Sequence, residues 1–118
     1  MPHQNFILKS LCGMVMTRLE KLQGMLQDSP EDVFLNYALA MEHVSGGRKD
    51  DALTAFRRVL TLDANHSAAW FQQAQLLASA SQFAEARESA ARGVEAAKVQ
   101  GDQHAVEEIG GFLESLPK

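Results

Sequence analysis

The chain has 118 residues, of which 46% are hydrophobic and 22% charged, with 8 Gly, 3 Pro and one Cys. That length suits one domain with its own core, and the composition excludes collagenous, disordered and linker-like chains. A single cysteine excludes a disulfide framework and a multi-cysteine zinc site. The formal net charge of −4 argues against nucleic-acid binding as the main activity. We expect one soluble, cytoplasmic domain.

The charge is spread unevenly along the chain. Residues 1–60 hold seven Lys or Arg and seven Asp or Glu, whereas residues 61–118 hold four and eight. The nearest approach to a basic patch comprises Arg48, Lys49, Arg57 and Arg58. Asp50 and Asp51 offset half of this charge, which is typical of a solvated rim. We therefore predict no nucleic-acid partner.

The most apolar window, residues 6–16, is too short to be a membrane span. It falls far short of the roughly 20 residues that cross a bilayer, and Lys9 and Ser10 interrupt it. It also lacks the basic start and small-residue cleavage site of a secretory signal. Residues 1–16 are therefore taken as an N-terminal extension. Met14 and Met16 precede a convincing helix over 17–28, so the natural start lies either there or at Met1, and the sequence leaves both open.

A repeat with a period of 34 residues organises the rest of the chain. A shift of 34 aligns Ala40 with Ala74, Tyr37 with Phe71, Ala52 with Ala86, and Leu60 with Val94. Each unit contains two helix-length segments and a short turn. We predict a half-repeat helix over 17–28, one repeat over 31–64, a second over 65–100, and a capping helix over 102–116.

Start and stop signals place the individual helices. Ser29 as the cap, followed by Pro30 and two acids, predicts a helix over about 31–45 that ends at Gly46. Asp50 is the expected cap of the next helix, over about 51–63. The second unit is expected to form helices near 67–79 and 83–99. The last segment has one apolar face, formed by Val106, Ile109, Leu113 and Leu116.

The repeat resembles the tetratricopeptide repeat, a 34-residue helix–turn–helix with the pattern W-x2-L-G-x2-Y, then A-x3-F, then P. In the second unit Trp70 supplies the Trp, and Gln73, Ala74 and Leu77 follow it. In the first unit Leu39, Ala40 and Ala52-x3-Phe56 fit the pattern. The departures that mark the repeats as degenerate are Asn36, His43, Gln73 and Ala90. The resemblance implies an all-α fold of about two repeats in a right-handed superhelix.

Small residues at equivalent positions have a mechanical explanation. Antiparallel helices joined by a short turn cross at about 8–10 Å, which requires Ala or Gly at the contact. We assign this place to Ala40 and Ala74 on the first helices and to Ala52 and Ala86 on the second. Because one repeat cannot bury its own apolar faces, the flanking helices are expected to cover the ends.

No set of residues with catalytic or metal-binding spacing is present. No two of the four histidines lie within four residues of each other, and Cys12 has no activating neighbour. His43 is expected to be a buried structural residue, and His66 and His104 to be solvated. Gly46-Gly47-Arg48-Lys49 lacks the strand and the spacing of a phosphate loop. We predict that the protein is not an enzyme and has no cofactor and no metal.

The resemblance leaves a surface as the functional element. In this family the inner face of each first helix lines a concave groove that commonly holds a peptide or protein. By register, that face includes the predicted binding residues Phe34, Tyr37, Met41, Val44, Phe71 and Gln75, together with Ala68 and Ala78. Because the groove is apolar, acidic chaperone tails are not its expected ligand.

The predicted function is non-catalytic protein–protein interaction, as a small adaptor or assembly factor. The expected partner is a protein or peptide, with no nucleic acid and no membrane. The alternative is a structural subunit that uses the groove for self-association, so the chain is a monomer or a homodimer. A further alternative is that the C-terminal helix covers the groove.

Overall fold

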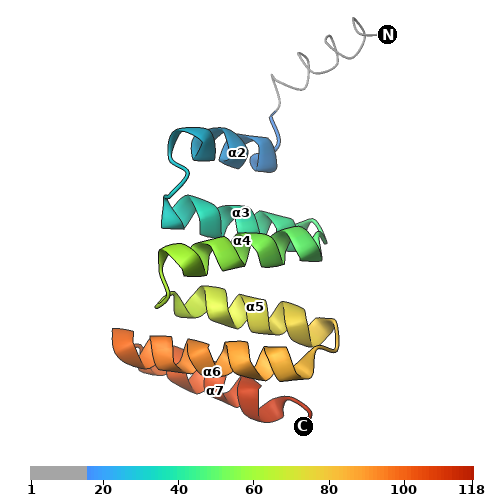
Figure 1. Cartoon of the computed structure of the whole chain (residues 1–118), viewed down its shortest axis with the longest axis vertical. Coiled ribbons are helices and arrows are strands. Elements are labelled where there is room, and N and C mark those ends of the chain that lie inside the picture. Colours follow the sequence, from blue (N-terminus) through green and yellow to red (C-terminus); the bar gives the residue numbers. More distant parts are fainter. Residues whose placement is uncertain (1–15) are drawn as a thin grey trace, which may run out of the picture.

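The computed structural model describes residues 16–118, which form six α-helices and no strand (Figure 1). In chain order these are α2 (Arg18–Asp28), α3 (Val33–Ser45), α4 (Lys49–Leu62), α5 (Ser67–Ser79), α6 (Phe83–Gln100) and α7 (Gln103–Ser115). The helices α3 and α4 form one helix–turn–helix unit, and α5 and α6 form the next. The predicted all-α class is confirmed. The expectation for the N-terminal extension falls on residues 1–15, outside the described residues, and on Met16.

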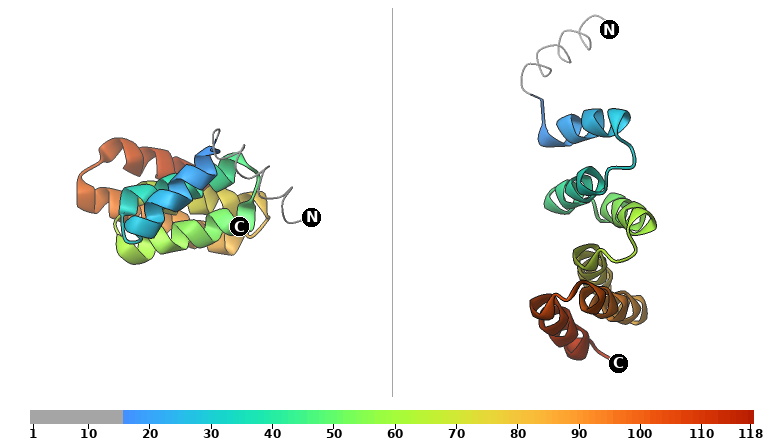
Figure 2. Two further views of the ribbon diagram at one scale, coloured as in Figure 1. Left: turned by 90° about the horizontal axis from the view of Figure 1, so that it is seen from above. Right: turned by 90° about the vertical axis from the view of Figure 1, so that its left-hand side faces the viewer.

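The helices stack into an elongated body with extents of 55 × 28 × 20 Å. Each helix from α2 onward packs against the next one in the chain. Figure 2 shows two layers: α3, α5 and α7 lie on one side, and α4 and α6 lie on the other. We call these the first and second layers. The layered stack is the arrangement that the 34-residue period predicts.

The first two helices begin with side-chain caps. At α2, the backbone N–H of Glu20 donates to Thr17 Oγ1 at 3.1 Å, and Thr17 N–H donates to Glu20 Oε1 at 3.3 Å, a reciprocal capping box. The predicted cap of the next helix is wrong, because Ser29 instead terminates α2. Asp32 caps α3 by accepting from Leu35 N–H at 2.9 Å. Sequence signals for the two ends overlap in so short a turn.

The later termini differ from one another. The residue before α4 is Arg48, which makes no side-chain cap bond, so the prediction of Asp50 as the cap is wrong. Asp50 lies in the first turn of α4, where a negative charge still favours the helix dipole. The end of α6 is Gly101, whose left-handed φ of 71° suits glycine and turns the chain into α7. Asp102 then caps α7.

The apolar core consists of two clusters that meet at α5. The first comprises Ala40, Ala52, Ala55, Phe56, Val59 and Ala69 from α3, α4 and α5. The second comprises Ala74, Ala90 and Ile109 from α5, α6 and α7. The four alanines assigned to helix contacts, at positions 40, 52, 74 and 86, are each 0% exposed. Their predicted place between helices is therefore confirmed.

Asn36 takes over a hydrogen bond that the family's tryptophan position makes in the second repeat. There, Trp70 Nε1 donates to the carbonyl oxygen of Ala64 at 2.9 Å. In the first repeat, Asn36 Nδ2 donates to the carbonyl oxygen of Pro30 at 3.0 Å. Both pairs are six residues apart, and the two sets differ by the repeat period of 34. The amide thus preserves the tie between the preceding turn and the helix without the indole ring.

Two histidines have structural contacts. His43 is buried as predicted, and its Nδ1 accepts from Arg48 Nε at 2.9 Å. The prediction that His66 is solvated is wrong. His66 is half-buried, its Nδ1 accepts from Ala69 N–H at 3.1 Å, and its ring stacks on Tyr37 with centroids 4.8 Å apart. Both histidines therefore fix turns between helices.

Gln73 is a departure from the family pattern that is only half satisfied. Its Nε2 donates to Ser89 Oγ at 3.1 Å, and that hydroxyl donates to the carbonyl oxygen of Trp70 at 2.9 Å. Its Oε1 is buried and has no hydrogen-bond partner in the part of the chain that the structure describes. Leu39 occupies the equivalent position of the first repeat. A buried polar atom without a partner costs about 1–3 kcal/mol.

We expect Gln73→Leu to raise the free energy of unfolding by about 1 kcal/mol, because it removes the unpaired amide and restores the apolar residue of the first repeat. Urea denaturation followed by circular dichroism measures this difference. Gln75→Leu, at an exposed position of the same helix, serves as the control and should change stability by less than about 0.5 kcal/mol. A destabilised Gln73→Leu would mean that the amide is better satisfied than the structure indicates.

Candidate functional site

The described residues offer surfaces for binding and no grouped metal ligands. Within residues 16–118, no three or more His, Cys, Asp or Glu side chains come together as they would around a metal ion. No helix in that range is long and apolar enough to cross a membrane. We therefore searched the surface for hollows with exposed apolar side chains.

The predicted groove residues of α3 line a hollow of about 300 Å³ next to α2. Its lining residues are Arg18, Phe34, Tyr37, Ala38, Met41, Glu42 and Ser45. Phe34 is 77% exposed, the largest exposure among the exposed large hydrophobic residues of the described chain. We call this the α2–α3 hollow. It combines an open phenylalanine with partly buried aromatic and methionine side chains, residue types that are enriched at protein interfaces.

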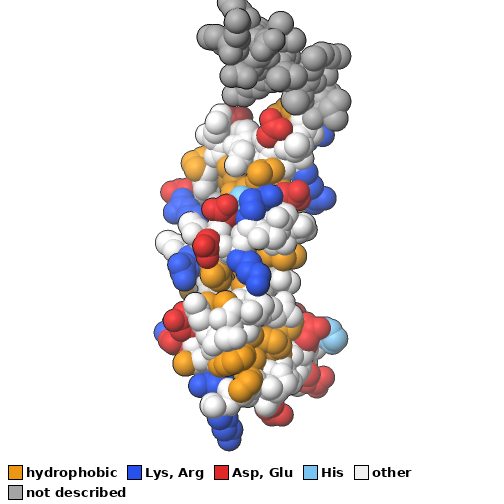
Figure 3. Space-filling model, turned by 90° about the vertical axis from the view of Figure 1, so that its right-hand side faces the viewer, with side chains coloured by type: hydrophobic (Ala, Val, Ile, Leu, Met, Phe, Trp, Pro, Cys, Tyr) orange, Lys and Arg blue, Asp and Glu red, His pale blue; other side chains and the backbone are white. Residues whose placement is uncertain are grey.

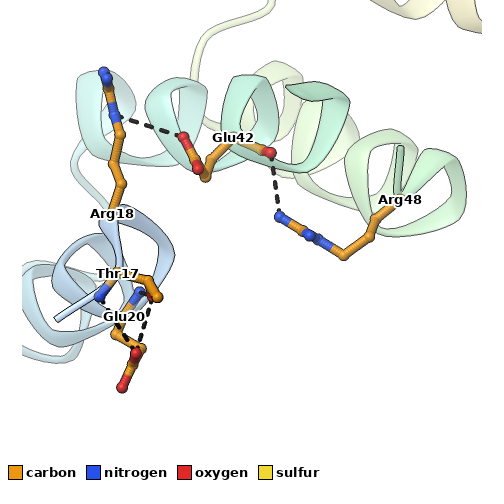
Figure 4. A network of polar contacts seen from close by, with 5 residues as sticks. All are labelled: Thr17, Arg18, Glu20, Glu42 and Arg48. Atoms are coloured by element: carbon orange, nitrogen blue, oxygen red, sulfur yellow. Dashed lines mark hydrogen bonds and ion pairs between the residues drawn. The ribbon is translucent and has the colours of Figure 1, made fainter. Parts of the chain in front are cut away.

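A polar bridge closes one side of the α2–α3 hollow (Figure 4). Arg18 Nε on α2 lies 3.5 Å from Glu42 Oε2 on α3. Arg48 Nη2 donates to the main-chain carbonyl oxygen of Glu42 at 3.2 Å. The capping box of Thr17 fixes the start of α2 beside this bridge. The bridge pairs the two charged side chains that line the hollow, so the rest of its lining is apolar or weakly polar.

Tyr37 forms the floor of this hollow and is held by two rings. It meets the buried Phe56 edge-to-face with centroids 5.9 Å apart, and it stacks on His66. Burial raises the pKa of the Tyr37 phenol above its ordinary value, because desolvation disfavours the phenolate. The ring is therefore a fixed, uncharged contact surface.

A second hollow, of about 430 Å³, lies between α5 and α7. Its lining residues are Ser67, Ala68, Phe71, Gln72, Asp102, His104, Ala105, Glu108 and Ile109. Phe71 is half-buried, and Phe112 of α7 contacts it edge-to-face with centroids 5.5 Å apart. We call this the α5–α7 hollow. The C-terminal helix thus covers part of the predicted groove and adds its own side chains there.

The structure brings together some of the predicted binding residues and separates others. Phe34, Tyr37 and Met41 meet in the α2–α3 hollow, and Phe71 lines the α5–α7 hollow. Val44 is half-buried and packs against the first core cluster. Gln75 is exposed and lines neither hollow.

Sequence reasoning missed the contributions of the flanking helices. Arg18 comes from α2, and Asp102, His104 and Glu108 come from α7. The half-repeat pattern over 17–28 was the available signal, because it places α2 before α3 as a second helix would stand. No repeat signal marks the face that α7 contributes.

The second layer carries a different, more polar cleft. Two adjoining hollows of about 390 and 370 Å³ share Trp70, Glu88 and Arg92. The Arg92 guanidinium lies 5.6 Å from the centroid of the Trp70 ring and 3.3 Å from Glu88 Oε1. These contacts occupy the charged groups with one another, so we regard the first layer as the better candidate site.

The side of the molecule that lies at the right of Figure 1 is shown in Figure 3. Hydrophobic side chains are visible there level with α2 and α3 and, more widely, level with α5 to α7. Charged side chains of both signs lie between these areas. Apolar surface is therefore concentrated at the two ends of the repeat stack.

Paired helices that recur every 34 residues, buried alanines at the helix contacts and a two-layer stack define a small, degenerate tetratricopeptide-repeat-like protein. A comparison with known proteins agrees. The TPR repeat-containing protein PA0015 of Pseudomonas aeruginosa is 26% identical over 100 residues, which cover 85% of this chain and 95% of that protein. No protein-family model matches the sequence.

Solved structures share the same fold. The solution structure of BPP2914 from Bordetella parapertussis is 29% identical, with a TM-score of 0.73 over 84% of this chain and 86% of that one. A tetratricopeptide repeat domain protein of Salinibacter ruber is 27% identical, with a TM-score of 0.67 over 71% and 85%. PcrH, solved with the chaperone binding region of PopD, is 16% identical with a TM-score of 0.80 over 96% and 86%, a likeness of fold alone.

Proposed function

We propose that this protein is a non-catalytic adaptor or assembly factor that binds a peptide segment of another protein along its first layer. The observation that carries the proposal is the α2–α3 hollow, where the ring of Phe34 is 77% exposed above Tyr37 and Met41. An exposed apolar ring over a fixed aromatic floor is the type of anchor site around which interfaces form. PcrH, which has the same fold, was solved with a region of its partner.

The alternative is self-association through the same apolar surface. An exposed Phe34 is equally suited to a second copy of the chain, because hydrophobic burial is not directional. Sedimentation analysis of the purified protein separates the two: the adaptor proposal expects a monomer at micromolar concentration. A dimer that dissociates in Phe34→Ala would favour the alternative.

The test of the proposed function uses phage-displayed random 12-residue peptides selected on the full chain. We expect the enriched peptides to bind Phe34→Ala at least about 30-fold more weakly, because truncating a central aromatic costs about 2 kcal/mol or more. Fluorescence anisotropy of labelled peptides measures the affinities. Stability should be almost unchanged, since the ring is exposed.

Val99→Ala is the matched control for this test. Val99 is 70% exposed on α6, outside both first-layer hollows, so its truncation should leave the peptide affinity unchanged. Equal losses in both variants, or no enriched peptide at all, would contradict the proposal.

A further inference from the structure

We propose that the bound segment combines an apolar anchor with a lysine or arginine about six residues away. The anchor enters the α2–α3 hollow, and the cation enters the α5–α7 hollow. This inference rests on the proposed function and adds the chemical class of the partner.

The α5–α7 hollow is acidic as well as partly apolar. Asp102 and Glu108 line it, and no Lys or Arg does so. One oxygen of Asp102 accepts from Ala105 N–H at 3.1 Å, so capping accounts for part of its role. Glu108 lies beyond the first turn of α7 and makes no ion pair or side-chain hydrogen bond within residues 16–118. Helix capping therefore leaves its charge unexplained, and the carboxylate is available to a cation.

The two hollows differ in charge, which gives the surface a polarity. In the α2–α3 hollow, Arg18 and Glu42 offset each other at 3.5 Å. In the α5–α7 hollow, the charges of Asp102 and Glu108 have no such offset among the lining residues. A peptide that carries its positive charge beside α7 is complementary to this pattern, whereas a carboxylate placed there is repelled.

The hollows lie on one layer at a spacing that a short peptide can span. Tyr37 lines one and Phe71 lines the other, and these residues are separated by the repeat period, so they occupy the same face of successive first helices. Packed helices lie about 8–10 Å apart, so the two hollows are about two helix spacings, or roughly 20 Å, apart. About six residues of extended chain cover that distance.

Phenylalanine is the best-matched anchor side chain on physical grounds. The exposed ring of Phe34 and the fixed ring of Tyr37 can both contact an aromatic side chain, and aromatic pairs add to simple area burial. Methionine at position 41 adapts its shape to the inserted group. The cation then distinguishes this peptide from other apolar segments.

The experiment uses the full chain and two synthetic 12-residue probe peptides that share a Phe near one end. One carries Lys and its twin carries Glu, each six residues from the Phe. We expect the Lys probe to bind wild type about tenfold or more tightly than the Glu probe at 50 mM salt, with the difference shrinking at 500 mM salt because the charges are exposed. The probes are read by fluorescence anisotropy.

Charge reversal assigns the preference to one residue. In Glu108→Lys, the Lys probe should lose about tenfold in affinity and the Glu probe should gain. Glu114→Lys makes the same change at an exposed position of α7 outside the hollow, and its peptide preference should match wild type. Circular dichroism confirms that both variants are folded.

The outcomes separate this inference from the proposed function. Equal binding of both probes, or a Glu108→Lys variant that keeps the wild-type preference, overturns the basic-partner inference, while Phe34-dependent binding still supports the proposed function. If the phage selection gives no binding peptide and neither probe binds, both are overturned. A Lys preference that Glu108→Lys reverses supports both.

Discussion

Phe56→Ala should lower the free energy of unfolding by about 3–5 kcal/mol, the usual cost of removing a fully buried phenylalanine. Phe56 is 0% exposed, lies in the first core cluster and supports the ring of Tyr37. The truncation therefore leaves a cavity shared by α3, α4 and α5. Chemical denaturation monitored by circular dichroism measures the loss.

Phe34→Ala is the matched control, because it removes the same side chain from an exposed site. It should change the free energy of unfolding by less than about 0.5 kcal/mol. Similar effects of the two variants would mean that the assignment of Phe56 to the core and Phe34 to the surface is wrong.

Gly93→Leu should destabilise the protein by about 1–3 kcal/mol or more, because no space exists for a side chain there. A Cβ atom at position 93 would lie 3.0 Å from Trp70 Cβ and 3.4 Å from two atoms of Ile109. The glycine thus lets α6 approach α5 and α7 together. Thermal unfolding of the purified variant measures the effect.

The control for this substitution is Gly24→Leu in α2. A Cβ atom at position 24 meets no atom within 4 Å, and leucine favours a helix over glycine by about 0.8 kcal/mol. Gly24→Leu should therefore keep or slightly raise the melting temperature. A tolerated Gly93→Leu would show that α6 can shift away from its neighbours.

The sequence was sufficient to predict the repeat and its buried contacts. The 34-residue period placed four alanines between helices, and all four are 0% exposed. It also predicted that His43 is buried. These features depend on spacing and side-chain size, which a single sequence displays directly.

Other features depend on how turns and flanking helices pack, which the sequence does not display. The cap of α3 was predicted at Ser29 but lies at Asp32, because both polar residues suit a helix start. His66 was predicted to be solvated, since nothing in the sequence shows that its ring meets Tyr37 across the repeat boundary. The role of Gly93 was missed for the same reason: its neighbours belong to α5 and α7.

The binding surface was predictable in part. The register grouped Phe34, Tyr37 and Met41 correctly on one face of α3, which is the face that lines the α2–α3 hollow. It could not show that Phe112 covers Phe71, because α7 does not follow the 34-residue pattern. Whether these residues bind a partner stays a prediction.

Helix α5 contributes to both core clusters, through Ala69 in the first and Ala74 in the second. Its two faces are therefore satisfied only when the units on either side are folded. Separation of the stack into independent halves would expose one of these faces, which couples the halves thermodynamically. In contrast, α2 packs mainly against α3 and can detach with little loss elsewhere. Local opening should begin at α2, next to the proposed anchor site, and reach α5 only upon global unfolding.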